Sequence, residues 1–548
     1  MEIPALDYTP TLPVFLRKRA AELGEKDFVV TLDKRMSYAE AERTSRRVAK
    51  ELIARGAGKG ARIGFMFGNG TEWVVSWLAI SRIGGIAMPF STAYRPAELL
   101  KGLKLGDVDT LMIPKTLVGH DHLSFVEHTL PSLAHVTVPG RPLRLPEAPY
   151  LRSILITEST DRAWAGTIDL EPGHGSDHPD ISDELFEAIE ADVHPSDPIF
   201  VIFTSGTTAE PKGVVHTHGT WVRHGANVAE ANDVRSGHIT YGGMPLFWIG
   251  GVSHTLGPLM QRGNTFLCTE KFDPSEAIEL VIREKATQLY MFPNMIQRFR
   301  DEVAATGVDV TGVPAFAPVT PPEPGSKAQS LGMTETCAAY MANGPLEDVI
   351  PDEYRGAFGL PVPMMQYKFI DLETGDDLPE GVEGEICVRG YNLMAGMLKK
   401  ERHETFLDDG FYRTGDKGYR KGPYFFFNGR AKDLIKSSGA NVAPREVEVL
   451  LDSYPEVLMS VVMGVMDPER GETVGAAIVR RSGAAVDPVE LVTRLNRELS
   501  SYKVPRKVLV IDEAEMPYVS TGKPDRQALA SRVEADGVSV SPRRESDS

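Results

Sequence analysis

The ten residues TSGTTAEPKG, at positions 204–213, follow directly on an apolar run at 198–203. Such a run predicts a buried strand, so the ten-residue segment is expected to begin where that strand ends. Gly206 and Gly213 would let the backbone approach a phosphate, and Lys212 would add a positive charge. The spacing is not that of a G-x-x-x-x-G-K-[ST] P-loop, and the alternative is a polar turn. The hydroxyls that can donate to phosphate oxygens are those of Thr204, Ser205, Thr207 and Thr208.

Upstream of this loop, helices and strands are predicted to alternate. Ser37 and Glu40 form a capping box at the start of one helical pattern, and Gly56 ends it. Alternation of this kind is typical of a parallel sheet, so we expect an α/β fold with a large N-terminal domain of packed sheets over residues 1–431. The predicted elements are a helix at 36–56, a strand at 62–67 and a buried helix at 72–83.

The composition changes twice along the chain. Residues 136–198 are rich in Pro, Asp, Glu and Gly, which predicts surface loops. Later, a helix opened by Pro444, an apolar strand and a helix capped by Asp487 predict a small C-terminal α+β domain over residues 432–533. Residues 534–548 end without apolar periodicity and are expected to form a flexible tail.

The bulk properties exclude several classes of protein. The chain has 548 residues and a formal net charge of −17 without a long Lys/Arg run, so no nucleic acid is expected as a partner. Three scattered cysteines, Cys268, Cys337 and Cys387, suggest neither disulfides nor zinc. No apolar stretch approaches the roughly 20 residues of a membrane span, and the N-terminus lacks the basic start of a signal peptide. A cytoplasmic location is expected.

Five short motifs follow one another along the chain. They are TSGTTAEPKG at 204–213, LGMTET at 331–336, YRTGD at 412–416, GRAKDLIKSSGANVAPREVE at 429–448 and STGKPDR at 520–526. In this order they resemble the adenylate-forming superfamily of acyl-CoA synthetases, firefly-type luciferases and peptide-synthetase adenylation domains. The resemblance spans nearly the whole chain. It implies a large and a small domain joined by a hinge at Lys432, about which the small domain turns between two reactions.

The resemblance also implies a nucleotide site. Thr334 would hydrogen-bond the α-phosphate of ATP, and Glu335 would hold Mg²⁺, which balances the charge of the departing pyrophosphate. Asp416 would bind the ribose, because a carboxylate can accept two hydrogen bonds from a vicinal diol. Arg430 would be a second nucleotide clamp. The ATP- and AMP-binding set is completed by Leu331, Gly332, Met333 and the residues of the 204–213 loop named above.

The last two motifs imply the two catalytic steps. Lys523 would bridge the attacking carboxylate and the α-phosphate, neutralising charge as pentavalent phosphorus forms, and would catalyse adenylation together with Thr334 and Glu335. Gly439 would line the tunnel for the pantetheine arm of coenzyme A, where a side chain would obstruct the thiol. The residues assigned to CoA binding are Lys436, Ser438 and Gly439.

Other residues leave their role open. PLFWIGG at 245–251 resembles the acyl-pocket motif, so Trp248 and Gly251 are assigned to the pocket, although Trp248 would serve equally well as core packing. His216 and His218 have no third ligand nearby, which favours a structural or nucleotide-adjacent role over a metal site. Cys337 is expected to pack, because adenylate chemistry needs no enzyme thiol.

Three positions depart from the family pattern. Ala209 stands where the loop usually has a third glycine, and Leu331 stands where an aromatic residue usually stacks on adenine. The stretch 293–332 is shorter than usual and rich in proline, where a strand, a turn and a helix normally wall the acyl and adenine pockets. Ala209 predicts altered loop motion or ATP affinity, and Leu331 predicts weaker adenine binding. The shortened stretch predicts either a more open pocket or impaired catalysis.

Taken together, the motifs predict an ATP-dependent ligase that converts a carboxylic acid to its acyl-AMP and then transfers the acyl group to coenzyme A. One alternative is the same chemistry with a carrier-protein phosphopantetheine as acceptor. Another is a noncatalytic adenylate- or acyl-binding homologue. The expected partners are a small carboxylic acid, of the fatty, aromatic or sterol-derived class, together with ATP, Mg²⁺ and coenzyme A. The sequence leaves a homodimer open.

Overall fold

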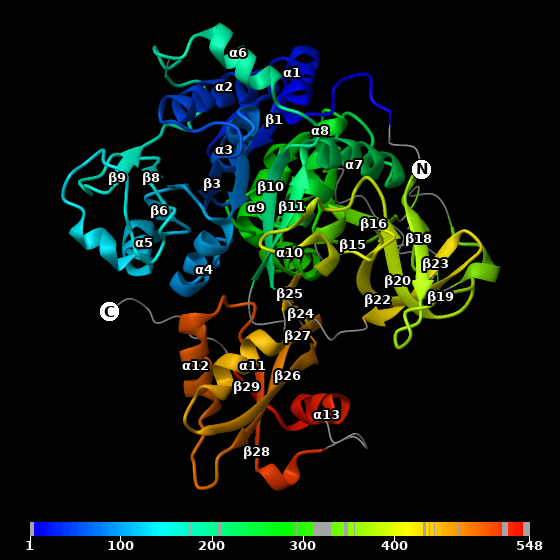
Figure 1. Cartoon of the computed structure of the whole chain (residues 1–548). Coiled ribbons are helices and arrows are strands. Elements are labelled where there is room, and N and C mark those ends of the chain that lie inside the picture. Colours follow the sequence, from blue (N-terminus) through cyan, green and yellow to red (C-terminus); the bar gives the residue numbers. More distant parts are fainter. Residues whose placement is uncertain are drawn as a thin grey trace. The chain divides into compact units, whose positions relative to one another are not determined.

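The chain divides into two compact units in the computed structural model (Figure 1). A larger unit comprises Met1–Thr92, Leu103–Ile202 and Gly213–Gly429, and a smaller unit comprises Ala93–Gly102, Phe203–Lys212 and Arg430–Ser548. Lys432 lies outside the described residues, so the hinge and the domain boundary stay predictions. The structure describes residues 5–175, 177–205, 211–291, 293–310, 313, 330–342, 344, 349–355, 357–430, 435–437, 439–442, 444–468, 471–517 and 524–540.

An eight-stranded sheet forms the centre of the larger unit. Its order is β21-β11-β10-β4-β3-β5-β8-β9, and the described registers pair β10, β4, β3, β5, β8 and β9 in parallel. The apolar run at 198–203 falls in β10, as predicted. The strands are β3 (Arg62–Phe65), β4 (Ile86–Pro89), β5 (Thr110–Ile113), β8 (Ser153–Ile156), β9 (Ala165–Thr167), β10 (Pro198–Ser205), β11 (Pro211–Thr217) and β21 (Gly396–Met397).

Helices cover this sheet because their apolar residues recur at helical spacing. The predicted capping box is present in α2, where the Ser37 hydroxyl accepts from the Glu40 backbone and the Glu40 carboxylate accepts from Ser37 N. Helix α3 is apolar nearly all round and is almost completely buried. The helices of this layer are α1 (Leu12–Leu23), α2 (Tyr38–Ala54), α3 (Thr71–Arg82), α5 (His122–Thr129), α6 (Asp183–Ala191) and α7 (His218–Ala231), whereas α4 (Pro96–Gly106) belongs mainly to the smaller unit.

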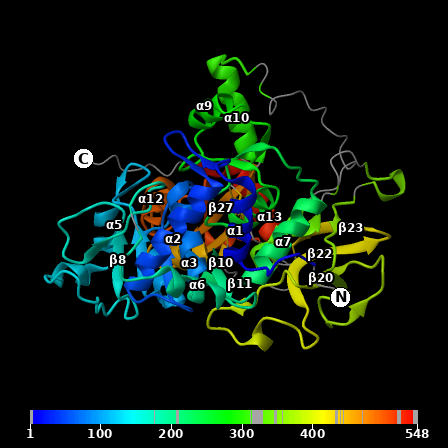
Figure 2. The ribbon, with the colours of Figure 1, turned by 90° about the horizontal axis from the view of Figure 1, so that it is seen from above.

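A second sheet of the larger unit has the order β14-β12-β13-β1-β2. Its helices α9 and α10 lie side by side, which Figure 2 shows from above. A π-helical segment at Gly250–Leu256 leads into α8. The elements are β1 (Asp27–Val30), β2 (Arg35–Ser37), β12 (Ile239–Gly242), β13 (Thr265–Leu267), β14 (Gln288–Tyr290), α8 (Gly257–Gln261), α9 (Pro274–Arg283) and α10 (Pro293–Thr306), and a separate hairpin joins β6 (Thr116–Leu117) to β7 (His120–Asp121).

Two antiparallel sheets complete the larger unit. One has the order β15-β16-β17 and the other β19-β18-β20-β22-β23, and their apolar side chains share one core cluster. The strands are β15 (Leu331–Met333), β16 (Ala338–Ala342), β17 (Leu360–Pro361), β18 (Gln366–Ile370), β19 (Asp377–Leu378), β20 (Gly384–Arg389), β22 (Tyr412–Lys421) and β23 (Tyr424–Arg430).

The smaller unit contains the predicted C-terminal α+β elements. Its sheet has the order β26-β27-β28-β29, and a β24-β25 hairpin precedes it. The Asp487 carboxylate caps the predicted second helix by accepting from Val489 N. The elements are β24 (Ile435–Ser437), β25 (Ala440–Val442), β26 (Val457–Asp467), β27 (Gly471–Arg480), β28 (Lys507–Ile511), β29 (Val538–Ser539), α11 (Pro444–Asp452), α12 (Pro488–Glu498) and α13 (Arg526–Asp536).

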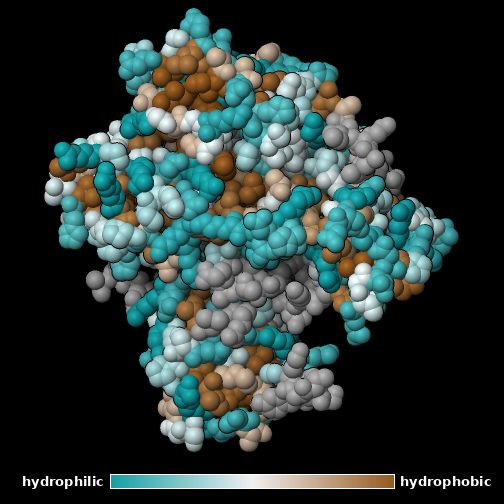
Figure 3. All heavy atoms as spheres, in the orientation of Figure 1, coloured by the Kyte–Doolittle hydropathy of each residue, from teal (hydrophilic) through white to brown (hydrophobic). Residues whose placement is uncertain are grey.

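The prediction that 136–198 consists of surface loops is wrong in part. This stretch supplies β8 and β9 to the central sheet, and it forms α6. The short run SILI at β8 is buried, and a strand this short between Pro-rich segments carries little sequence signal. The face of the molecule in Figure 3 is mainly hydrophilic, with apolar residues in separate patches. Among the described helices, none is both long and apolar enough to cross a membrane.

A buried ion pair ties α6 to α3. Arg82 and Glu190 side chains are each 1 % exposed, with Arg82 Nε 2.6 Å from Glu190 Oε1. We expect Glu190→Ala to lower the free energy of unfolding by about 2 kcal/mol, because it removes a buried carboxylate that pairs with Arg82 and leaves Glu42 as the charge partner of that guanidinium. Glu187→Ala, on the same helix but 59 % exposed, should change it by less than about 0.5 kcal/mol. Thermal unfolding compares the two, and equal shifts would contradict the prediction.

Candidate active site

The LGMTET motif forms a hairpin strand and a tight turn. Leu331 and Met333 on β15 point into a core cluster with Tyr340 of β16, and Leu331 is only 5 % exposed. Between them, a Cβ on Gly332 would lie 2.3 Å from the carbonyl oxygen of Ala338, so only glycine fits this register. The structure therefore gives Leu331 a packing role in the hairpin, and its contact with adenine stays a prediction.

The turn after β15 presents two side chains. Residues Thr334–Thr336 form one 3₁₀ turn, closed by Cys337 N donating to Thr334 O at 3.1 Å. Cys337 is left-handed, with φ +61°. From outside the turn, Met394 N donates to Glu335 O at 2.9 Å. With its backbone held in this way, the turn leaves Thr334 and Glu335 half-buried, and neither side chain hydrogen-bonds or ion-pairs within the described part of the chain.

His216 holds the same turn from β11. Its Nε2 lies 2.7 Å from the carbonyl oxygen of Thr334. Burial lowers the pKa of His216 to about 4, so the imidazole is neutral near pH 7. Because a carbonyl oxygen can only accept, Nε2 carries the proton and donates. His216 therefore positions the turn, which agrees with the structural or nucleotide-adjacent role predicted for it.

Other buried histidines support the fold around the turn. His218 Nδ1 accepts from Leu12 N at 3.1 Å, and His224 Nδ1 lies 3.2 Å from the hydroxyl of Tyr391. The Sγ of Cys337 is fully buried, and burial raises its pKa to about 12. A thiol with this pKa stays protonated at neutral pH, so the prediction that Cys337 packs is consistent with its environment.

The Asp416 side chain is hydrogen-bonded to Tyr340 of the β15–β16 hairpin, a residue that lies outside the motifs. Asp416 lies on β22 and is 1 % exposed, and the hydroxyl of Tyr340 donates to its Oδ2 at 2.5 Å. Asp416 N donates to the hydroxyl of Thr414 at 3.1 Å. Tyr340 and Asp416 are 76 residues apart. A hydrogen bond between different sheets leaves no local pattern, so sequence reasoning missed Tyr340.

The ends of the phosphate-loop motif are described. Thr204 and Ser205 end β10, and Lys212 and Gly213 lie at the start of β11. A Cβ on Gly213 would lie 2.7 Å from Leu398 Cδ1 and 3.0 Å from Val201 Cγ1. Packing against these two side chains is enough to favour glycine here, and the role of Gly213 in admitting a phosphate stays a prediction. Gly206, Thr207, Thr208 and Ala209 lie outside the described residues.

The PLFWIGG segment is anchored by Asn69. Its Oδ1 accepts from Leu246 N at 2.8 Å, and its Nδ2 donates to Met244 O at 3.0 Å. Trp248 is half-buried and meets Phe247 edge-on, with ring centroids 5.7 Å apart. A Cβ on Gly251 would lie 2.1 Å from the carbonyl oxygen of Pro245, so the local turn alone requires that glycine. The assignment of Trp248 and Gly251 to an acyl pocket stays a prediction.

The smaller unit carries the remaining predicted residues. Gly439 has φ +83° in the turn between β24 and β25, where Ser437 pairs with Ala440. This hairpin requires a glycine whether or not a ligand passes it. Lys436 is exposed, and Lys523, Lys432 and Ser438 lie outside the described residues, as does the side chain of Arg430.

The sheets of the larger unit, the presented Thr334–Glu335 turn and the buried Asp416 together define an adenylate-forming enzyme. The model of the AMP-binding enzyme family matches residues 16–398, and that of the AMP-binding enzyme C-terminal domain matches residues 446–523. This chain belongs to the AMP-binding enzyme family and is an AMP-forming ligase.

Relatives of known name match nearly the whole chain. The mitochondrial medium-chain acyl-CoA ligase ACSF2 of Rattus norvegicus is 26 % identical over 520 residues, covering 91 % of this chain and 83 % of that protein. A feruloyl-CoA synthase of Amycolatopsis sp is 27 % identical over 501 residues, covering 89 % and 92 %. The solved amide bond synthetase McbA of Marinactinospora thermotolerans has a TM-score of 0.74 at 24 % identity, covering 94 % and 99 %, which supports the fold.

The buried histidines predict acid sensitivity. Burial lowers the pKa of His216 to about 4 and those of His218 and His224 to about 3, whereas an unfolded histidine titrates near 6.5. Below pH 6.5 the unfolded chain binds protons that the folded chain does not. Each histidine therefore lowers the free energy of unfolding by up to about 1.4 kcal/mol per pH unit as the pH falls towards its folded pKa.

His224→Gln should reduce the slope of the unfolding midpoint against pH between 6.5 and 5. The matched control is His403→Gln, because His403 is exposed. Thermal unfolding over this range measures both slopes, and a slope unchanged by His224→Gln would contradict the assignment of a neutral, buried imidazole.

Proposed function

We propose that this chain is an AMP-forming acyl-CoA synthetase. In the first step, a substrate carboxylate oxygen attacks the α-phosphorus of ATP, the bond to pyrophosphate breaks, and acyl-AMP forms. In the second, the thiolate of coenzyme A attacks the acyl carbon and AMP leaves. The observation that carries the proposal is the Thr334–Glu335 turn, held rigidly by its backbone with both side chains presented. Positioning and charge neutralisation would supply most of the rate.

The turn is suited to a magnesium-bound triphosphate. Mg²⁺ takes one or two protein carboxylates and completes its shell with phosphate oxygens and water. Glu335 offers one such carboxylate, and within the described ranges no three His, Cys, Asp or Glu side chains gather into a cage. Thr334 would donate to the α-phosphate beside it. The loop residues from Thr204 to Lys212 would hold the β- and γ-phosphates, a role that rests on the motif.

Asp416 would bind the ribose of the nucleotide. Its carboxylate is oriented by the Tyr340 hydroxyl, and Tyr340 belongs to the hairpin that also carries Thr334. This connection would fix the spacing between the ribose and the α-phosphate. Leu331, Gly332 and Met333 form the strand that sets that spacing, and Arg430 follows on β23 as the second clamp.

The second step rests on the motifs of the smaller unit. During adenylation, Lys523 would neutralise charge at the α-phosphate. Rotation of the small domain about Lys432 would then move Lys523 away from the acyl-AMP and bring the CoA-binding residues to it. Lys436, Ser438 and Gly439 would line the path of the thiol. The acid would lie against Trp248. By their names, two relatives of this chain act on medium-chain acids and on ferulate, so we propose an acid with an apolar chain or an aromatic ring.

Purified protein with MgATP, coenzyme A and a panel of medium-chain, long-chain and aromatic acids tests the proposal. Pyrophosphate release reports the first step, and acyl-CoA detected by mass reports the second. We expect a thioester with at least one acid. Pyrophosphate release without a thioester would point to a different acceptor, and no release with any acid of the panel would contradict the proposal.

Lys523→Ala should reduce adenylation by orders of magnitude while leaving thioester formation from supplied acyl-AMP nearly intact. The reason is that charge develops at phosphorus in the first step only. Lys507→Ala, which removes an exposed contact to the carbonyl of Glu534 in the same unit, is the control. Equal loss of both half-reactions would remove Lys523 from its assigned role.

Tyr340→Phe should raise the Kd for AMP about tenfold, because the Asp416 carboxylate loses the hydroxyl that orients it. Tyr419→Phe is the control, since Tyr419 lies on the same strand as Asp416 and stacks on Phe426 without a hydroxyl hydrogen bond in the described chain. Isothermal titration measures both. Unchanged affinity in Tyr340→Phe would show that Asp416 needs no orienting partner or does not bind the ribose.

A further inference from the structure

The larger unit carries a cavity at the edge of its central sheet opposite the phosphate-loop motif. Strands β10, β4, β3, β5, β8 and β9 are parallel, so β10 ends at the carboxyl edge of the sheet, at Ser205 within the motif. Thr110, Ser153 and Ala165 begin β5, β8 and β9 and mark the amino edge. All three residues line a cavity of about 590 Å³, which is therefore separate from the nucleotide site.

The floor of this cavity is apolar. Leu52 from α2, Leu155 from β8 and Trp164 before β9 line it, and each is at most 6 % exposed. The Trp164 Nε1 donates to Glu127 Oε1 at 3.2 Å, which fixes the indole ring. A volume of about 300–1,000 Å³ with such a floor is typical of sites for small organic molecules.

The rim of the cavity is positively charged. Arg55, Arg141 and Arg152 line it, whereas Asp109 is the one acidic residue among the lining residues. Burial raises the pKa of Asp109, and its carboxylate already accepts from Arg62 N at 2.6 Å. The lining therefore has a net positive charge, although the whole chain carries a formal net charge of −17.

Two of these arginines have no acidic partner among the described residues. There, Arg152 Nη1 donates to two backbone carbonyls, at 2.8 Å to Pro149 and at 3.5 Å to Leu143. Arg141 makes no hydrogen bond or ion pair with any residue that the structure describes. By contrast, Arg55 Nε donates to Glu51 Oε1 at 2.7 Å. Guanidinium groups that pair with no described carboxylate, beside an apolar floor, suit a carboxylate, sulfonate or phosphate, which they can bind through paired N–H groups.

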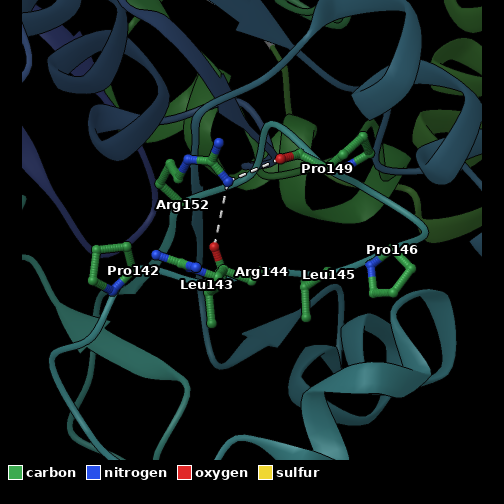
Figure 4. A pocket seen from close by; sticks show the side chains of 7 residues that line it. All are labelled: Pro142, Leu143, Arg144, Leu145, Pro146, Pro149 and Arg152. Carbon is green, nitrogen blue, oxygen red and sulfur yellow. Dashed lines mark hydrogen bonds between the residues drawn. The ribbon is translucent and has the colours of Figure 1, made fainter.

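A second cavity, of about 500 Å³, continues the same surface. It shares Pro142 and Arg152 with the first cavity and adds Arg144, which also lacks an ion pair within the described ranges. Figure 4 shows Arg152 between the two carbonyl groups that it contacts, on the loop that carries Arg144 and Pro146. The loop at 140–152 thus brings three arginines to one surface. Arginines that served only as solvated surface charges would not need to lie beside a cavity with an apolar floor. Their arrangement therefore favours a ligand site.

We propose that the surface formed by Arg141, Arg152 and the floor around Trp164 is a second ligand site, for an organic anion with an apolar or aromatic body. The body lies on Leu52, Leu155 and Trp164, and the anionic group binds Arg141 and Arg152. Occupancy of this site does not compete with AMP, because Thr334 and Asp416, which are proposed to bind AMP, belong to other sheets and their turns and do not line this cavity.

Binding of anilinonaphthalene sulfonate to the full chain, followed by fluorescence in saturating AMP, tests the site. The dye has an aromatic body and one sulfonate, and phenylnaphthylamine is its uncharged analogue. We expect one class of dye site that AMP does not displace, and at least tenfold weaker binding of the uncharged analogue. Displacement by AMP, or equal binding of the two dyes, would overturn the proposal.

Arg141→Ala combined with Arg152→Ala should raise the Kd of the dye at least tenfold. Arg43→Ala combined with Arg355→Ala removes two exposed arginines elsewhere and should leave it within twofold. Ala165→Phe fills the cavity at the start of β9 without changing charge, and it should also abolish binding. Thermal unfolding confirms that each variant is folded. Unchanged dye affinity in both the arginine pair and Ala165→Phe would overturn the site.

Discussion

The hydrogen bond from His216 to the carbonyl of Thr334 joins β11, which follows the 204–213 motif, to the LGMTET turn, and its two residues lie 118 positions apart. It depends on a neutral imidazole, because the carbonyl needs a donor and the buried site disfavours a charge. Around it, Cys337 N donates to the same carbonyl, Met394 N donates to Glu335 O, and Asn392 Nδ2 donates to Thr336 O. With its backbone fixed in this way, the turn offers Thr334 and Glu335 to a ligand at little further cost in conformational entropy.

The Asp416 side chain is also held by a hydrogen bond from a residue distant in sequence. A carboxylate that is 1 % exposed must be hydrogen-bonded, and Tyr340 supplies one of its bonds. Because Tyr340 lies on the strand after the turn, the α-phosphate and ribose positions are linked through one short hairpin. A substitution that shifts this hairpin would therefore disturb both positions together, which makes the hairpin the structural centre of the proposed nucleotide site.

The central sheet separates two chemical environments. Its carboxyl edge leads into the hydroxyl-rich loop, as is usual for ligand sites in open α/β sheets. Its amino edge carries the arginine-lined cavity, built largely from a stretch whose composition predicts loops. The parallel arrangement keeps these edges apart, because every strand from β10 to β9 points the same way.

Local patterns in the sequence were sufficient to predict the α/β class, the capped helices α2 and α12, strand β10 and the order of the motifs. The reason is that capping and apolar periodicity involve residues only a few positions apart. Strand β8 was missed, because a run of three apolar residues after a Pro-rich segment carries little signal. Only the tertiary structure paired Tyr340 with Asp416 and His216 with Thr334, and only it showed that Gly213 packs against Leu398 and that the backbone of Pro245 requires Gly251. Such contacts join residues that chain folding brings together, and no spacing along the sequence encodes them.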